Sequence, residues 1–547
     1  MVPLKQKVMR TMESIPQVIK DQDDFDNLIQ THGAEEAIPT LAKIYWDKPS
    51  DLVNIVRGSQ SLRITKSSIS TVAIFFHALS IGGGERVTRD LAASWLRMGF
   101  NVVVMTNTDP TEDDYTLPKE IKRVTIPTYI GDLRENYAER CRGLRKALLD
   151  SDVDLVVFSQ WFSDVLAFDI LSAKTLGIPF IFFIQTSFTQ FFLDADLPSR
   201  FVDIPMQYSL ADGIVCLSEM DQHFWKKFHS NTRCTNNPVT QTPPASPAPL
   251  LGHTVIWPAR LHVDKYPLRV IPIMKALVEK VPDAVIWMIG PTDPALENEL
   301  MSQAAACGIK RNVVICGPQS EEQMTSWYEK ADVFLLTSRR EGWSLALGEA
   351  LEAGLPCVMY SLPYLTLTHN NPAIMEITQN DAEGAANALA SILLDKQRAR
   401  CMGEKGRAFM NRISKYDYEA FWRSCFNSVL IPEYDQDHST AEQQQKAESE
   451  SSSLEKIMWQ ELLEAYRSHL ATIELERGQH ELCRDQLKIN RETIARLETT
   501  LQETQAELNH ILASKSFKIG IALTQFPRTI LSFFRGRKRS KASDRIQ

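Results

Sequence analysis

Several features that would assign the chain to a common class are absent from its 547 residues. No run approaches the roughly 18 consecutive apolar residues of a membrane-spanning helix, and the first residues lack the apolar stretch of a secretory signal. The nine cysteines are scattered and include no C-x-x-C pair, which argues against a disulfide framework or a cysteine-rich zinc site. A net charge of −8 gives no support to nucleic-acid binding through bulk positive charge. We therefore expect a reduced, cytoplasmic protein that is neither exported nor membrane-spanning.

Short apolar runs separated by helix-length segments are abundant, and they fall into two blocks, 69–238 and 253–434. Runs without polar alternation are typical of strands buried on both faces of a parallel sheet. Prolines crowd the segment 239–252 between the blocks, which we interpret as a semi-rigid linker. The expected strands are 72–76, 101–106, 154–158, 178–184, 212–218, 253–259, 284–290, 312–317, 332–338 and 355–360. The predicted fold class is α/β, with two doubly wound, Rossmann-like domains facing a cleft.

Four further segments flank these blocks. Residues 1–68 carry acids at positions 21, 23, 24 and 26 and are interpreted as a polar helical extension with a solvated face. Residues 435–453 form a low-complexity tether, 454–513 a coiled coil and 514–547 a basic amphipathic tail. The alternative for 454–513 is a single exposed helix. The alternatives for 514–547 are a disordered basic tail and a patch that binds nucleic acid. The heptad seam comprises Trp459, Tyr466, Ile473, His480, Leu487, Ile494, Leu501 and Leu508.

A glycine-rich passage, Gly82–Gly84, lies between the expected strand 72–76 and an amphipathic helix. Without Cβ atoms, such a loop lets backbone N–H groups approach a ligand, and the helix N-terminus that follows favours an anion. The passage is not G-x-G-x-x-G, so simple turn chemistry is an equal alternative.

A pair of cations follows the first strand of the second block. Arg260 lies at the exit of that strand, and Lys265 lies five residues later at the start of the next helix. Both can face the predicted cleft. An arginine fork and a lysine point charge together suit a diphosphate.

The most specific passage begins after the strand that ends at Ser338. Glu341 lies in the loop, and Glu349 lies on the helix that follows, about 8 Å along its axis at 1.5 Å per residue. The backbone amides at the positive end of this helix can bind phosphate. They belong to Gly342, Trp343, Ser344 and Leu345. A ligand with a central phosphate, a hydroxyl-rich group at one end and a ribose at the other fits this spacing, as in a nucleotide sugar.

Residues 72–430 resemble the retaining GT-B glycosyltransferases of glycosyltransferase family 4. The resemblance rests on several motifs in the expected order, of which the last contains the family's E-x7-E pattern, Glu341 to Glu349. These motifs are SIGGGERVTRDLA, LADGIVCLSE, NNPV, PARLHVDK and ADVFLLTSRREGWSLALGEALEAGLPCV.

The resemblance implies that Arg260 and Lys265 neutralise the donor diphosphate, that Glu341 contacts the transferred sugar, and that Glu349 holds the ribose. It also implies that Gly83 and Gly84, with the amides near Ser344 and Leu345, approach the phosphates, and that the nucleobase lies near Gly317, Pro318 and Gln319. One position departs from the family. Gln185 stands where a histidine often faces the sugar, and an amide cannot share a proton near neutral pH.

We therefore expect transfer of a sugar from a UDP- or GDP-linked donor to a glycan or lipid-linked acceptor in surface-polysaccharide synthesis. The family implies retention of anomeric configuration. Because no Asp-x-Asp stands at a strand end, we expect neither a metal nor another cofactor. The tail predicts contact with an anionic membrane, and the coil predicts self-association or a protein partner. One alternative is a scaffold protein without catalytic turnover, which the replacement of the family's histidine by Gln185 keeps open. The other alternative is a sugar-nucleotide epimerase.

Overall fold

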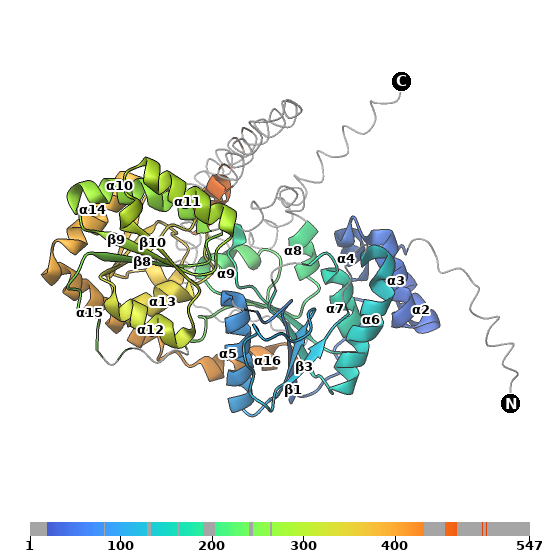
Figure 1. Cartoon of the computed structure of the whole chain (residues 1–547). Coiled ribbons are helices and arrows are strands. Elements are labelled where there is room, and N and C mark those ends of the chain that lie inside the picture. The colour runs from blue at the N-terminus through green and yellow to red at the C-terminus, as the bar shows by residue number, and fades with distance from the viewer. Residues whose placement is uncertain are drawn as a thin grey trace, which may run out of the picture. The chain divides into compact units, whose positions relative to one another are not determined.

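The computed structural model of the chain describes residues 19–80, 82–127, 133–160, 163–189, 203–239, 244, 246–262, 265–430, 454–465, 467, 495 and 499 (Figure 1). Contacts divide the chain into two units, Met1–Phe191 with Asp196–His438 and Phe192–Ala195 with Ser439–Gln547. Both sheets belong to the first of these units.

The first domain is built on a seven-stranded parallel sheet of order β3-β2-β1-β4-β5-β6-β7. The inner strand β1 is buried along its whole length and pairs on one side with β2 and on the other with β4. The order of strands reverses between β1 and β4, which is the position where α/β sheets of this kind bind ligands. The strands are β1 Thr71–Phe75, β2 Asn101–Thr106, β3 Lys122–Thr125, β4 Leu155–Phe158, β5 Phe180–Phe183, β6 Gly213–Cys216 and β7 Thr232–Cys234.

The second domain repeats the design with a six-stranded parallel sheet of order β10-β9-β8-β11-β12-β13. Here the order reverses between β8 and β11, which pair in parallel. The strands are β8 Thr254–Pro258, β9 Val285–Ile289, β10 Val313–Gly317, β11 Val333–Leu336, β12 Cys357–Tyr360 and β13 Ile374–Ile377. The expected α/β class with two Rossmann-like domains is therefore confirmed.

Helices connect the strands, and several begin where the sequence supplies a polar cap. Asp293 caps α11, and Ser320 with Gln323 forms a capping box at the start of α12. Asp381 and Asp395 cap α14 and α15. The connecting helices are α5 Gly83–Arg97, α6 Leu133–Asp150, α7 Leu166–Lys174, α8 Asp203–Tyr208, α9 Glu219–Trp225, α10 Val270–Lys280, α11 Pro294–Ala306, α12 Glu321–Lys330, α13 Leu345–Glu352, α14 Ala382–Leu393 and α15 Lys396–Ile413.

The helix α16, Tyr418–Ser428, follows the second domain in sequence but packs on the first. Trp422 is fully buried, and its ring lies 5.0 Å from that of Trp95 on α5 and 5.6 Å from that of Phe183 on β5. The chain therefore crosses between the two domains twice.

The helices before the first sheet are packed rather than merely solvated. They are α2 Gln22–His32, α3 Ala34–Tyr45 and α4 Pro49–Val56. Phe25, Leu41 and Leu52 are fully buried, and Trp46 stacks on Phe168 of α7 at 5.8 Å. Asp26, one of the four acids expected on a solvated face, instead accepts hydrogen bonds from residues that follow α4. The acids at positions 21, 23 and 24 are exposed, as expected for a solvated face, and the apolar residues of the helices form a buried side that the sequence analysis did not predict.

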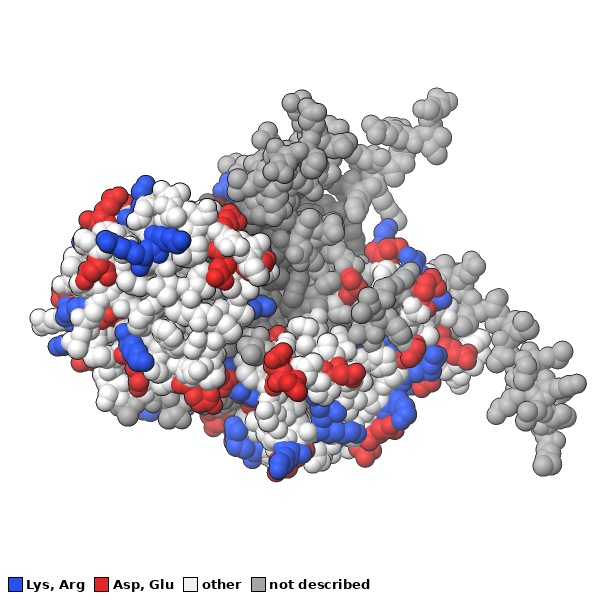
Figure 2. All heavy atoms as spheres, viewed as in Figure 1, with Lys and Arg blue, Asp and Glu red and all other residues white. Residues whose placement is uncertain are grey.

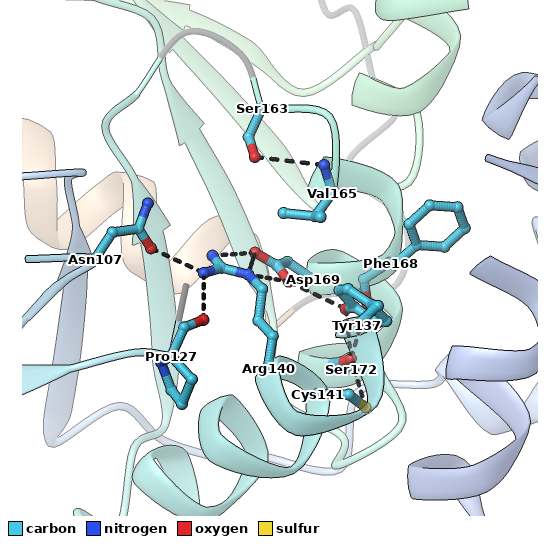
Figure 3. A network of polar contacts seen from close by, with 10 residues as sticks. All are labelled: Asn107, Pro127, Tyr137, Arg140, Cys141, Ser163, Val165, Phe168, Asp169 and Ser172. Atoms are coloured by element: carbon cyan, nitrogen blue, oxygen red, sulfur yellow. Dashed lines mark hydrogen bonds and ion pairs between the residues drawn. The ribbon is translucent and has the colours of Figure 1, made fainter. Parts of the chain in front are cut away.

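A buried ion pair fastens the carboxyl ends of β2 and β3 to the helices beside them (Figure 3). Arg140 of α6 donates to Asp169 of α7 at 2.7 Å, to Asn107 after β2 at 2.8 Å and to the Pro127 carbonyl after β3 at 3.1 Å. Tyr137 donates to the same aspartate at 3.0 Å. Because removal of one partner leaves a buried charge uncompensated, such a pair strongly constrains this edge of the sheet.

In the second unit, residues 454–465 are helical, and Met458 and Leu462 are buried. Most of the predicted heptad seam lies outside the described residues, as do the tether 435–453 and the tail 514–547. The coiled coil therefore stays a prediction.

Candidate active site

The predicted cations and the predicted catalytic carboxylate follow two neighbouring strands of the second sheet. Arg260 and Lys265 come after β8, and Glu341 comes after β11. These strands flank the point at which the strand order reverses. The three residues therefore meet at the edge of the sheet where ligand binding is expected.

Lys265 and Glu341 form an ion pair, with Nζ 2.7 Å from Oε1. Ser338 donates to the same carboxylate oxygen at 2.7 Å, and the Glu341 side chain is only 10% exposed. Thr337, at the end of β11, donates to the Lys265 carbonyl at 3.0 Å and accepts from Trp257 at 2.8 Å. The loop carrying the lysine is thus fixed to both strands, and the ion pair is preorganised.

Arg260 is exposed, and its guanidinium makes no hydrogen bond or ion pair with the residues that the structure describes. Its backbone lies against Gly290, where a Cβ atom would come within 2.1 Å of the Ala259 carbonyl oxygen. The Gly290 amide donates to the Gly317 carbonyl at 3.0 Å. The loops after β8, β9 and β10 are therefore in contact, which brings the expected nucleobase segment next to the arginine.

In that segment, Gly317 has a φ of +68°, a conformation that favours glycine. The Gln319 side chain is already engaged, because it donates to the Cys316 carbonyl and accepts from Trp327, both at 3.0 Å. Recognition of a base here would therefore fall largely to the backbone around Gly317 and Pro318.

The N-terminus of α13 has an unusual geometry. Ser344, its N-cap residue, has a φ of +65° and no side-chain cap hydrogen bond. A left-handed conformation is strained for serine, and such strain concentrates at functional sites. Trp343 is 3% exposed and donates to Asn236 of the first domain at 3.2 Å. Its side chain therefore joins the two domains and leaves only its backbone for an anion.

The glycine loop, Gln185 and the loop before α13 come together across the two domains. A Cβ atom on Gly342 would lie 2.0 Å from the Gln185 carbonyl oxygen. One on Gly84 would lie 3.7 Å from Gln185 Oε1, and one on Gly83 would lie 3.9 Å from Leu345 Cδ1. Five residues predicted from three separate motifs are thus in one place.

Gln185, the departure from the family, follows β5 and donates through its side-chain amide to the Ser159 hydroxyl after β4. The Gln185 side chain is half-buried and lies beside Gly84. The position that the family often gives to a histidine therefore carries an oriented amide.

Sequence reasoning missed the residues that surround Glu349. Arg86 of α5 donates to Glu349 Oε1, and Tyr328 of α12 donates to Oε2 at 2.9 Å. Arg86 also lies 3.3 Å from Glu321, which pairs with Arg89 at 3.0 Å. Arg86 is 263 positions from Glu349 in sequence, so no local pattern connects them. The only signal was the position of Arg86 just after the glycines.

Glu352, one turn beyond Glu349, is 7% exposed. Burial, and then the Glu349 carboxylate, raises its pKa to about 7 from an ordinary 4.5. Between these two pH values the folded state binds a proton that the unfolded state does not, so this group makes the protein less stable as pH rises through the window.

We expect Glu352→Gln to stabilise the protein at pH 8 by up to about 3 kcal/mol, because the pKa rises from 4.5 to about 7 and one pKa unit corresponds to about 1.4 kcal/mol. The difference in melting temperature from wild type should be near zero at pH 4.5 and positive at pH 8. The exposed Glu404→Gln variant serves as the control. An equal difference at both pH values would contradict the shift.

Within the described ranges there is no group of three or more His, Cys, Asp or Glu side chains that could hold a metal ion. Among the helices described, none is long and apolar enough to cross a membrane.

Comparison with known families decides what these domains are. Residues 81–240 match the family described as Glycosyltransferase Family 4, and residues 244–409 match Glycosyl transferases group 1. The chain carries the two domains of a GT-B glycosyltransferase. The two matched regions of the chain contain every predicted site residue.

The curated proteins to which the chain is similar are distant. An uncharacterised glycosyltransferase of Haemophilus influenzae is 22% identical over 56% of this chain and 82% of its own length. An exopolysaccharide phosphotransferase of Streptomyces coelicolor is 27% identical over 33% of this chain and 19% of its own length. A GDP-mannose:cellobiosyl-diphosphopolyprenol alpha-mannosyltransferase of Xanthomonas oryzae pv. oryzae is 23% identical over 31% of this chain and 44% of its own length. The alignments thus span less than half of two of these relatives.

Solved structures agree on the fold. Sucrose-phosphate synthase of Thermosynechococcus elongatus superposes with a TM-score of 0.55 at 16% identity, covering 66% of this chain and 99% of that one. TarM of S. aureus, in a complex that includes UDP, also superposes with a TM-score of 0.55. The sequences are 12% identical, and the match covers 66% of this chain and 100% of that one. At these identities the likeness establishes the fold alone.

Proposed function

We propose that the protein transfers a sugar from a nucleoside-diphosphate sugar to a glycan or lipid-linked acceptor in surface-polysaccharide synthesis. The observation that carries the proposal is the meeting of Gly83, Gly84, Gln185, Gly342 and Leu345 across the domains, beside the Lys265–Glu341 ion pair. The Xanthomonas relative named above acts on a diphosphopolyprenol-linked sugar and takes GDP-mannose, which favours an acceptor and a donor of these classes.

In this proposal the donor diphosphate lies between Arg260, Lys265 and the first amides of α13. The Arg260 guanidinium is unpaired among the described residues, and Lys265 can exchange the Glu341 carboxylate for a phosphate oxygen. Glu341 is then released to accept hydrogen bonds from the transferred sugar, while Glu349 accepts them from the ribose. Gln185 faces the sugar from the first domain, and the backbone of Gly317, Pro318 and Gln319 borders the base.

The reaction breaks the bond between the anomeric carbon and the diphosphate oxygen and forms one to an acceptor hydroxyl oxygen. Preorganised cations and helix amides stabilise the charge that develops on the departing diphosphate, and in many enzymes such electrostatic stabilisation contributes more to the rate than any other effect. We propose retention, with the acceptor proton passing to the departing phosphate on the same face, and charge neutralisation without a metal. Retention rests on the family resemblance, and the proposal of no metal rests on the lack of an Asp-x-Asp sequence at a strand end.

Nucleotide release tests the proposal. Purified protein is incubated with GDP-mannose, UDP-glucose or UDP-N-acetylglucosamine, each with and without a diphosphopolyprenol-linked sugar. Acceptor-dependent release of UDP or GDP is the expected result. A new sugar nucleotide formed without acceptor would instead indicate an epimerase, and neither release nor donor-induced thermal stabilisation would favour a scaffold.

We also propose that the tail 514–547 holds the enzyme at the cytoplasmic face of an anionic membrane, and that 454–513 pairs as a coiled coil. Residues 515–547 contain nine Lys or Arg and one acid. On the face seen in Figure 2, in contrast, basic and acidic side chains of the described residues are interspersed. In the tail each cation contributes about 1 kcal/mol of attraction to anionic lipid.

Deletion of 515–547 is expected to move the protein from the membrane fraction to the soluble fraction, because both the apolar and the cationic groups are lost. A second variant has glutamine in place of Arg535, Arg537, Lys538, Arg539 and Lys541. A smaller fraction of this variant should sediment with anionic vesicles, and the fraction that sediments with neutral vesicles should not change. Unaltered fractionation of the deletion variant would rule out the tail as the anchor.

A further inference from the structure

The carboxylate of Glu349 is held from both domains. Tyr328, in the second domain, donates to Oε2 at 2.9 Å, and Arg86, in the first domain, donates to Oε1. The side chains of Arg86 and Glu349 are each 11% exposed. Burial opposes the charge of the arginine, but the Glu349 and Glu321 carboxylates outweigh it and raise the pKa of the guanidinium. The guanidinium is therefore charged, and its contact with Glu349 is shielded from water.

A carboxylate offers two oxygens with about four acceptor positions in total. Among the described residues, Tyr328 and Arg86 occupy one position on each oxygen, which leaves a further acceptor position on each oxygen of Glu349 in a fixed direction. Two adjacent acceptors match the vicinal hydroxyls of a ribose. A carboxylate free to rotate would present the same acceptors without a set orientation, and the hydroxyls would then have to order it on binding.

We propose that Arg86 is a positioning residue that orients Glu349 for the ribose diol of the donor nucleotide. Recognition of ribose by the second domain then depends on a side chain of the first, and the diol is held fully only when α5 contacts α13. This inference rests on the proposed function, because it takes the ligand to be a nucleotide.

The neighbouring Arg89 supplies a matched control. It lies on the same helix one turn after Arg86 and pairs with Glu321 at 3.0 Å. Its guanidinium lies 4.8 Å from the ring of Tyr115, and no contact with Glu349 occurs among its described interactions. Loss of Arg89 removes a cation and an interdomain ion pair without touching the carboxylate in question.

The test is calorimetric titration of the full chain with UDP and GDP and with their 2′,3′-dideoxy forms. Wild type is expected to prefer the ribonucleotide by about 10-fold, or about 1.4 kcal/mol. Arg86→Ala should lose most of this preference, and Arg89→Ala should keep it. Arg86→Lys, which keeps the charge but lacks the planar fork, should retain part of it and guards against a folding defect in the alanine variant.

The inference fails if Arg86→Ala weakens binding of both nucleotide forms equally, because the arginine would then act only on domain contact. It also fails if wild type does not distinguish ribose from dideoxyribose. Either result leaves the proposed function standing when wild type still releases nucleotide from a donor. If wild type binds no nucleotide at all, both proposals are overturned together.

Discussion

Replacement of Glu341 by glutamine is expected to lower kcat/KM for the nucleotide sugar by at least ~100-fold, or about 2.7 kcal/mol of barrier. The amide keeps the shape of the side chain but has no charge and only one oxygen, so it cannot accept hydrogen bonds from the sugar at both of its terminal atoms. Arg260→Ala is expected to have an effect of the same size, because it removes an exposed cation at the carboxyl end of β8.

The measurement is steady-state nucleotide release with acceptor present, over a range of donor concentrations. Glu404→Gln makes the same chemical change at an exposed site on α15 and should leave the rate unaltered. Rates like those of wild type in both Glu341→Gln and Arg260→Ala would refute the active-site assignment.

The second large loss of activity is expected from Gly342→Ala, which adds a single carbon atom. In Gly342→Ala the new Cβ would lie 2.0 Å from the Gln185 carbonyl oxygen and 3.2 Å from the Thr186 Cα. Both are backbone atoms of the first domain, so no side-chain rotation relieves the clash, and the backbone of one of the two loops must shift by about 1 Å. Misplacement of that size can cost about 100-fold in rate.

The melting temperature of Gly342→Ala should stay close to that of wild type, since neither domain's core is altered. Gly83→Ala adds the same carbon where the nearest atom, Leu345 Cδ1, is 3.9 Å away, and its loss of rate should be smaller. A Gly342→Ala enzyme with full activity would show that the approach of Gly342 to Gln185 is not needed for turnover.

The sequence predicted the strands that are buried on both faces, because such strands consist of a continuous run of apolar residues. All the central strands of both sheets were located, and so was the edge strand β10. The three that were missed, β3, β7 and β13, are edge strands of three or four residues with partly exposed side chains. Their sequences, such as Lys122–Thr125, carry charged residues that protect an edge from further pairing and also remove the apolar signal.

The predicted site residues were found through local motifs, and the structure brings most of them together. The motifs did not predict the contacts between residues that are far apart in the sequence. The Arg86–Glu349 pair and the hydrogen bond between Trp343 and Asn236 join segments whose proximity depends on how the two domains meet. Nor does any pattern mark Ser344 as left-handed, because serine rarely adopts that conformation.

The packing of α16 on the first domain has a consequence for the folding of the chain during its synthesis on the ribosome. Because a chain emerges from the ribosome N-terminus first and domains tend to fold as they emerge, the first domain is complete in sequence long before Trp422 is made. Until then Trp95 and Phe183 lack the ring that covers them. The nascent first domain therefore exposes an apolar surface while the whole second domain is being synthesised, and chains truncated before Tyr418 would retain that surface permanently.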